Sequence, residues 1–404
     1  MRDGWVDHVI WWQVYPLGFT GAEPAAGPGQ AVSHRLGHLE GWLDHLIGLG
    51  CNGLALGPVF ASGTHGYDTI DYLRIDPRLG DDADFDALVK ACRERGIRLL
   101  LDGVFNHAGR EFEPVRRALE AGSGEWVRWS GEYPYLFEGH DRLVTLNHES
   151  PVVRDFVADV MIHWLERGAD GWRLDAAYAV APEFWAAVLP RVRERFPDAW
   201  FVGEMIHGDY RDYVHRSGLD AVTQYELWKA IWSSLNDRNL FELAWALDRH
   251  RDVTGDFLPL TFLGNHDVTR IASRVADPRH VGHAMALLFF LPGVPSVYYG
   301  DEFGFRAVKE DRPGGDDAVR PAMPPGPDGV TDSGFTAVYQ ELIGVRRRHP
   351  WLTRATITVE ALANEHVVVT AEGDGRMALA LNLGDEPFRH ALGTVGPHAW
   401  AFFE

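Results

Sequence analysis

Eight short apolar runs are spread along the chain, each long enough for one β-strand. Between them, residues 35–50, 85–96 and 152–168 carry apolar positions three and four apart, the pattern of one helix face. Each of these stretches ends on a glycine, which is common just after the last helical turn. A strand–helix unit repeated eight times predicts an α/β protein built on a closed parallel sheet, the (β/α)8 TIM barrel. The expected strands are residues 9–15, 53–57, 97–102, 170–175, 199–204, 219–224, 258–264 and 295–300.

The connection after the third expected strand is unusually long and predicts a short insertion, over residues 108–150. A long connection after a barrel strand usually serves the functional site. Its five aromatic rings form either a small core of their own or a surface on which a ligand stacks, and the sequence leaves both open. They belong to Trp126, Trp129, Tyr133, Tyr135 and Phe137.

The end of the chain has a different pattern, with apolar and polar positions alternating between turn signals. This alternation predicts a small antiparallel β-sandwich after a helix that spans residues 333–350. We therefore expect a catalytic barrel from residues 1–107 and 151–349, an insertion domain at 108–150 and a C-terminal β domain at 350–404.

Four of the expected strands end at or near an acid: Asp102, Asp175, Glu204 and Asp267. The carboxyl ends of barrel strands meet at the face where TIM barrels build their active sites. Positions i and i+2 of a strand point to the same side, so Arg173 should lie beside Asp175 and lower its pKa. Glu204 follows an apolar run, which favours a raised pKa and suits a general acid.

Composition narrows the class of partner. Of 404 residues, 46% are apolar, and 58 acidic residues against 38 basic ones give a net charge of −20. Such a balance disfavours nucleic-acid and membrane partners and fits a small neutral substrate, while the oligomeric state stays open. The only cysteines, Cys51 and Cys92, are expected to be free buried thiols and give no zinc site. The first residues lack the pattern of a signal peptide, and the apolar run at 284–299 contains two prolines, so we expect a cytoplasmic protein.

The four acid-bearing segments, DGVFNH (102–107), GWRLD (171–175), FVGE (201–204) and FLGNHD (262–267), resemble the signature regions of the α-amylase family, glycoside hydrolase family thirteen. Further similar segments are HGYDTIDY at 65–72, TLNHES at 145–150 and GVPSVYYGDEFG at 293–304. The resemblance covers roughly residues 9–350 and is nearest to the branch of neopullulanases, cyclomaltodextrinases and oligo-α-glucosidases.

The resemblance implies a role for each matching residue. Asp175 would be the nucleophile, Glu204 the acid/base, and Asp267 the stabiliser of the transition state. Substrate-binding or supporting roles would fall to Tyr67, Asp102, His107, Arg173, His266, Asp316 and Arg320. Tyr178 and Ala179 stand where many α-amylases carry a lysine and a calcium-binding histidine, so we expect no essential metal and no cofactor.

The expected activity is that of a retaining α-glycosidase acting on short α-glucans or maltooligosaccharides. Double displacement needs the two reacting carboxyl groups about 5–5.5 Å apart. Ala176, directly after the nucleophile, occurs in some transglycosidases, so an isomerase or transglycosidase acting on maltose, trehalose or sucrose is an alternative. A catalytically silent carbohydrate-binding barrel is a third possibility, which calorimetry showing binding without hydrolysis would favour.

Overall fold

The computed structural model describes residues 4–27, 29–312 and 314–404. Eight parallel strands form one sheet, in the order β12-β11-β10-β5-β2-β1-β14-β13. An isolated parallel bridge between Thr223 and Leu260 joins the two edges, so the sheet closes and the predicted (β/α)8 barrel is confirmed. Its strands are β1 (Trp11–Val14), β2 (Gly53–Leu56), β5 (Arg98–Gly103), β10 (Gly171–Leu174), β11 (Trp200–Gly203), β12 (Ala221–Val222), β13 (Leu260–Phe262) and β14 (Val294–Tyr298).

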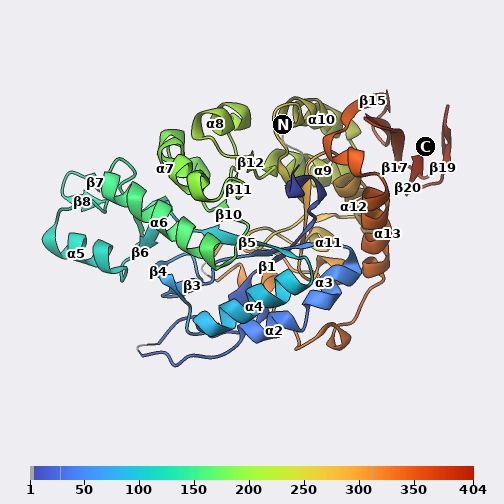
Figure 1. Cartoon of the computed structure of the whole chain (residues 1–404). Coiled ribbons are helices and arrows are strands. Elements are labelled where there is room, and N and C mark those ends of the chain that lie inside the picture. Colours follow the sequence, from blue (N-terminus) through green and yellow to red (C-terminus); the bar gives the residue numbers. More distant parts are fainter. Residues whose placement is uncertain (1–3, 28, 313) are drawn as a thin grey trace.

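Helices surround the barrel strands (Figure 1). The stretch 35–50, predicted as one helix, forms two, α2 and α3, separated at Gly41 and Trp42. Gly50 after α3 and Gly168 after α6 have φ angles of 99° and 116°, a left-handed backbone that glycine adopts without strain. The main helices are α1 (Pro16–Phe19), α2 (Leu36–Glu40), α3 (Leu43–Leu49), α4 (Asp82–Glu94), α6 (Pro151–Arg167), α7 (Pro182–Arg195), α8 (Tyr210–Ser217), α9 (Tyr225–Asp237), α10 (Leu240–Thr254), α11 (Ile271–Arg274), α12 (Val281–Phe290) and α13 (Phe335–Arg348).

Tryptophan side chains fill much of the core between strands and helices. Trp12 of β1 stacks on Trp42 with ring centroids 6.0 Å apart, and both are fully buried. Trp172 of β10 packs between Phe60 and Phe105 and is also fully buried. Truncating a buried tryptophan to alanine typically costs about 3–5 kcal/mol, so these rings hold the strands that carry the acids.

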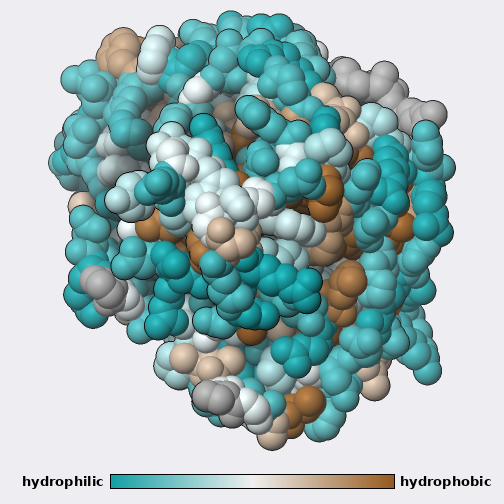
Figure 2. Space-filling view, turned by 90° about the vertical axis from the view of Figure 1, so that its left-hand side faces the viewer, coloured by the Kyte–Doolittle hydropathy of each residue, from teal (hydrophilic) through white to brown (hydrophobic). Residues whose placement is uncertain are grey.

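The segment between β5 and β10 projects from one end of the molecule (Figure 1). Among its aromatic residues, Trp126 packs on Phe112 and Phe156, as a small core requires, whereas Tyr133 is 77% exposed. Phe137 stacks on His107 with centroids 4.5 Å apart. The side of the molecule on which this segment lies is largely hydrophilic with scattered apolar patches (Figure 2). Its elements are β6 (His107–Gly109), α5 (Glu113–Ala121), β7 (Trp129–Ser130), β8 (Tyr133–Pro134), η2 (Phe137–Gly139) and β9 (Leu143–Thr145), and an earlier hairpin consists of β3 (Phe60–Ser62) and β4 (Thr69–Ile75).

The C-terminal strands form an antiparallel sheet in the order β15-β16-β17-β20, beside a two-stranded hairpin of β18 and β19. Val368, Ala380 and Val395 lie buried between sheet and hairpin, as the predicted sandwich requires. The sheet packs against α10 and α12, at the right of Figure 1. The strands are β15 (Thr356–Leu362), β16 (His366–Glu372), β17 (Arg376–Asn382), β18 (Phe388–His390), β19 (Gly393–Val395) and β20 (Ala399–Phe403).

Cys51 and Cys92 are free and buried, as predicted. Among the described residues, no helix combines the length and the apolar character needed to cross a lipid bilayer.

Candidate active site

The acids meet at the carboxyl ends of the barrel strands because of the strand register. Arg173 of β10 lies directly beside Asp102 of β5, and Leu174 beside Gly203 of β11. Asp175 directly follows β10 and Glu204 directly follows β11, so the two acids lie at the same level of the barrel. Three neighbouring strands thus place three carboxylates and one guanidinium together, as the sequence predicts.

Arg173 contacts all three carboxylates. Its Nη1 lies 2.7 Å from both oxygens of Asp102 and 3.2 Å from Asp175 Oδ1, and its Nη2 lies 2.7 Å from Glu204 Oε1. The four side chains are each at least nine-tenths buried. Three acids therefore share one cation in a region that water barely reaches.

The sequence-based expectation for the pKa of Asp175 is wrong. Burial and the neighbouring charge of Glu204 raise the pKa of Asp175 well above its ordinary value, against the lowering effect of Arg173. The pKa of Asp102 is likewise raised, because burial outweighs the guanidinium. One guanidinium shared by three carboxylates is too little positive charge to keep all of them ionised.

Asp267, in the loop after β13, has a different environment. Its Oδ1 accepts a hydrogen bond from Arg320 Nη2 at 2.8 Å, and its Oδ2 lies 3.0 Å from His266 Nε2. Burial favours the neutral acid, but His266 and Arg320 outweigh it and hold the pKa of Asp267 well below its ordinary value. The side chain of Asp267 is 32% exposed, so this carboxylate stays both ionised and accessible.

Arg320 comes from the long segment that follows β14. Its Nη2 also contacts Asp316 Oδ2 at 3.0 Å, and its Nε donates to the carbonyl of His266 at 2.9 Å. The guanidinium lies over the ring of Tyr15, 4.6 Å from the centroid. The Asp-x-x-x-Arg pair singled out in the sequence therefore lies at the site, joined to Asp267.

Tyr67 and His107 form the remaining part. The Tyr67 hydroxyl donates to Asp102 Oδ2 at 3.1 Å and makes a short hydrogen bond to His266 Nε2, and its ring stacks on His266. His107 has both ring nitrogens within hydrogen-bond distance of protein groups, the Tyr67 carbonyl at 3.0 Å and Asn106 Nδ2 at 3.1 Å. Burial lowers the pKa of His107 to about 3, so this imidazole is neutral at pH 7.

Three residues fix the position of Glu204 through contacts that the sequence does not predict. Its Oε2 accepts the backbone N–H of Ala176 at 2.9 Å, and its Oε1 accepts from the Tyr225 hydroxyl at 3.3 Å. Asn265 Nδ2 donates in turn to that hydroxyl at 2.8 Å. Ala176 has a φ angle of 47°, an uncommon conformation for alanine that aims its N–H at Glu204.

The insertion reaches the connection that follows β10. Tyr178, three residues after Asp175, donates its hydroxyl to Glu138 Oε1 at 2.9 Å, and Phe137 stacks on His107. Aromatic rings from both segments therefore lie beside His107 and the connection that carries Asp175.

Two groups of side chains have the composition and spacing to hold a metal ion among the described residues. They are Asp277, His280 and His398, and His34, Asp81 and Asp84, and neither includes a residue of this site.

An acidic, arginine-supported site at the carboxyl ends of a (β/α)8 barrel suits an enzyme that acts on glycosidic bonds. The family model of the α-amylase catalytic domain matches residues 13–130 and 122–324, most of the barrel. The chain belongs to the α-amylase family and is a glycoside hydrolase.

Individual relatives place it in the branch that the sequence motifs indicate. It is 31% identical to a cyclomaltodextrinase of Geobacillus thermopakistaniensis over 95% of this chain and 70% of that protein. It is 29% identical to neopullulanase 2 of Thermoactinomyces vulgaris over 94% and 70% of the two chains. Among solved structures, a cyclic α-maltosyl-(1→6)-maltose hydrolase of Arthrobacter globiformis in complex with maltose superposes with a TM-score of 0.86, at 27% identity and 99% coverage of both chains.

Proposed function

We propose that this enzyme hydrolyses α-glucosidic bonds in short maltooligosaccharides or related α-glucans, with retention of the anomeric configuration. The observation that carries the proposal is the shared guanidinium of Arg173, which contacts Asp175 and Glu204 at once beside the ionised Asp267. Retaining cleavage uses one carboxylate as nucleophile and one carboxylic acid as proton donor, both close to the same bond.

The first step needs Asp175 ionised and Glu204 protonated. Burial and the neighbouring charge of Glu204 raise the pKa of Asp175, so this acid has to give up a proton before it reacts. Glu204 then protonates the departing glycosidic oxygen while the Asp175 carboxylate attacks the anomeric carbon. The bond from carbon to the leaving oxygen breaks as the glycosyl ester on Asp175 forms.

The second step uses the same residues in reverse. The esterified Asp175 no longer carries a charge, so the Glu204 carboxylate has lost one like-charged neighbour. Glu204 then takes a proton from water as the water oxygen attacks the anomeric carbon, and Asp175 leaves as a carboxylate. Asp267, ionised and one-third exposed, faces the positive charge that develops on the sugar ring in both steps.

The names of the relatives support α-glucans as substrate class. They include cyclomaltodextrinases, neopullulanase and a hydrolase whose solved complex holds maltose. The aromatic residues Phe137 and Tyr178, which neighbour each other and His107, suit stacking against glucose rings.

The test is a product analysis on maltose, maltotriose, cyclomaltodextrins, sucrose and trehalose, with the anomeric configuration of the first product followed by NMR. We expect maltooligosaccharide hydrolysis that releases the α anomer first. Initial release of the β anomer would show inversion and refute double displacement. Isomerised or elongated products in place of glucose and maltose would identify a transglycosidase, and binding without any product would identify a carbohydrate-binding barrel.

A further inference from the structure

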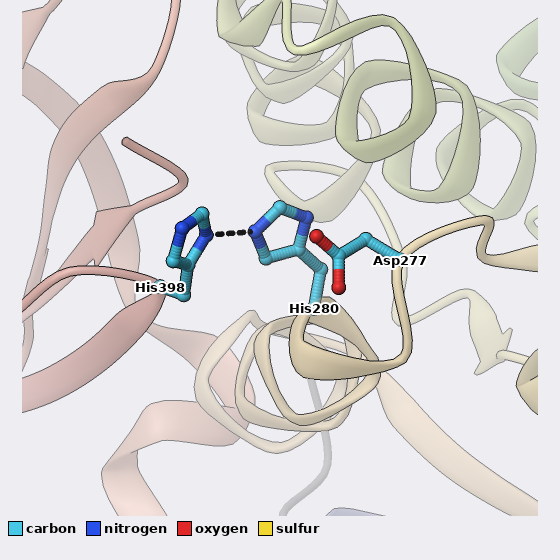
Figure 3. Close-up of side chains that lie close together, drawn as sticks. All are labelled: Asp277, His280 and His398. Carbon is cyan, nitrogen blue, oxygen red and sulfur yellow. Dashed lines mark hydrogen bonds between the residues drawn. The ribbon is translucent and has the colours of Figure 1, made fainter. Parts of the chain in front are cut away.

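A second cluster of polar side chains lies where the barrel meets the C-terminal sheet. Asp277 and His280 belong to the turn before α12, with His280 in the short helix η4 (Pro278–His280). His398 directly precedes β20, so it is 118 positions from His280 in sequence. Figure 3 shows the three side chains together, with the two imidazoles pointing toward each other.

The spacing of these groups matches a metal site. Each residue offers one ligand atom, and the three atoms lie within 4.8 Å of one another. His280 Nε2 and His398 Nδ1 are 3.0 Å apart. Two nitrogens on one tetrahedral zinc ion, with bonds of about 2.0–2.1 Å, lie roughly 3.3 Å apart, so a shift of a few tenths of an ångström would admit the ion.

His398 is oriented as a metal ligand usually is. Its Nε2 donates to Asp385 Oδ1 at 2.7 Å, which leaves Nδ1 with its lone pair directed at His280. Ligating histidines commonly donate their second ring N–H to a carboxylate, which fixes the tautomer and the ring. The φ angle of His398 is 49°, an uncommon backbone conformation that places its side chain, 9% exposed, inside the junction.

The other two residues have partners that a metal ion would replace. His280 is 1% exposed, and its Nε2, the atom that faces His398 Nδ1, takes part in the hydrogen bond between the two imidazoles. Asp277 accepts the backbone N–H of Arg279 at Oδ1, and the guanidinium of Arg279 donates to both carboxylate oxygens. The Arg279 side chain is 56% exposed, so it can move aside into solvent when a metal ion binds.

We propose that Asp277, His280 and His398 bind a divalent transition-metal ion, best matched by zinc, and so join the barrel to the C-terminal sheet. Two imidazoles and one carboxylate suit zinc, with water as a fourth ligand, and disfavour calcium or magnesium, which prefer oxygen. Asp385 is the positioning residue that holds His398. This proposal is independent of the proposed activity.

The first test is a zinc titration of the full-length, metal-stripped protein against a chromophoric chelator. We expect one equivalent of tightly bound zinc, and a tetrahedral absorption band when cobalt replaces it. His398→Asn removes the imidazole while keeping a residue that tolerates this backbone, and it should abolish this binding. Asp385→Asn should weaken affinity by about 10- to 100-fold, because it removes the charge that orients His398.

The matched control is His34→Asn, in the other histidine–aspartate cluster. Asp81 and Asp84 there already serve the N-terminal cap of α4, and His34 is 66% exposed. Zinc affinity should be unchanged in this variant. The proposal is overturned if the wild type binds no zinc, if His398→Asn retains the affinity, or if His34→Asn loses it.

A second measurement keeps the proposal falsifiable should His398→Asn fold poorly. Zinc should raise the thermal midpoint of the wild type in proportion to the logarithm of its concentration, since only the folded state brings the ligands together. Asp385→Asn should need about 10- to 100-fold more zinc for the same rise. An equal response of both proteins would contradict the site.

Discussion

The two halves of the active site neutralise their acids in opposite ways. Around Arg173, three buried carboxylates share one guanidinium, and the pKa of Asp175 is raised. Around Arg320, the carboxylate of Asp267 has both a guanidinium and His266, and its pKa is lowered. The proposed mechanism uses this difference: Asp175 and Glu204 take part in the bond changes, whereas Asp267, whose pKa is lowered, supplies negative charge.

The largest effect is expected when Asp175 or Glu204, the acids proposed to react with the substrate, is replaced. Glu204→Gln should lower kcat by about 10²–10⁴-fold, the usual contribution of a general acid, and Asp175→Asn should lower it at least as much. Steady-state kinetics on maltotriose would measure both. Glu183→Gln, the same change at an exposed position on α7, is the control and should retain activity. Turnover near that of the wild type in either site variant would contradict the assigned roles.

Arg173→Met removes the guanidinium that the three acids share. We expect the free energy of unfolding at pH 7 to fall by about 3–5 kcal/mol, as when one partner of a buried ion pair is lost. Denaturant unfolding measures this loss. The control Arg191→Met removes an exposed arginine paired with Asp155 and Asp159 and should cost about 0–1 kcal/mol. Equal losses in the two variants would mean that the shared guanidinium is not the main support.

Arg320→Ala perturbs the other half. It removes charge-assisted hydrogen bonds to Asp267, so kcat/KM should fall about 10- to 100-fold, equivalent to about 1.4–2.7 kcal/mol. Because the guanidinium helps to lower the pKa of Asp267, its loss should raise that pKa and move the acidic limb of the pH profile upward. An unshifted acidic limb would show that His266 alone keeps Asp267 ionised.

The smallest expected effect is a pair of stability changes with opposite signs. The pKa of Asp175 is higher in the folded state, so its ionisation destabilises the fold from about pH 4 upward. The free energy of unfolding of Asp175→Asn should therefore exceed that of the wild type by about 0.5–2 kcal/mol at pH 7, and the two should be equal below about pH 4. The pKa of Asp267 is lower when folded, so Asp267→Asn should lose stability at pH 7, and this difference should vanish as the pH falls. If both substitutions changed the stability at pH 7 in the same direction, the opposite pKa shifts of Asp175 and Asp267 would be refuted.

The sequence predicts the barrel and the positions of its acids well, because both follow from local patterns. Strand-length apolar runs define the eight strands, and the acids that end them must meet at one face. The pKa of Asp175 could not be predicted in the same way. Spacing within one strand shows that Arg173 lies beside Asp175, but only the pairing of β10 with β5 and β11 shows that Asp102 and Glu204 share that arginine.

Contacts between residues that belong to no recognisable motif also could not be predicted from the local sequence pattern. Tyr225 reaches Glu204 from the start of α9, and nothing in its neighbourhood distinguishes it from a core tyrosine. His280 and His398 come from different layers of the molecule, and only the packing of α12 on the C-terminal sheet brings them together.

The closure of the barrel between β12 and β13 has a consequence for motion. β12 has two residues, and an isolated bridge from Thr223 to Leu260 joins it to its neighbour. Glu204, Tyr225 and Asn265 line a small pocket beside this seam, so Glu204 lies next to the shortest strand of the barrel. Backbone amides there should exchange with deuterium sooner than those of β5 and β10, and a bound sugar should slow that exchange most at this seam.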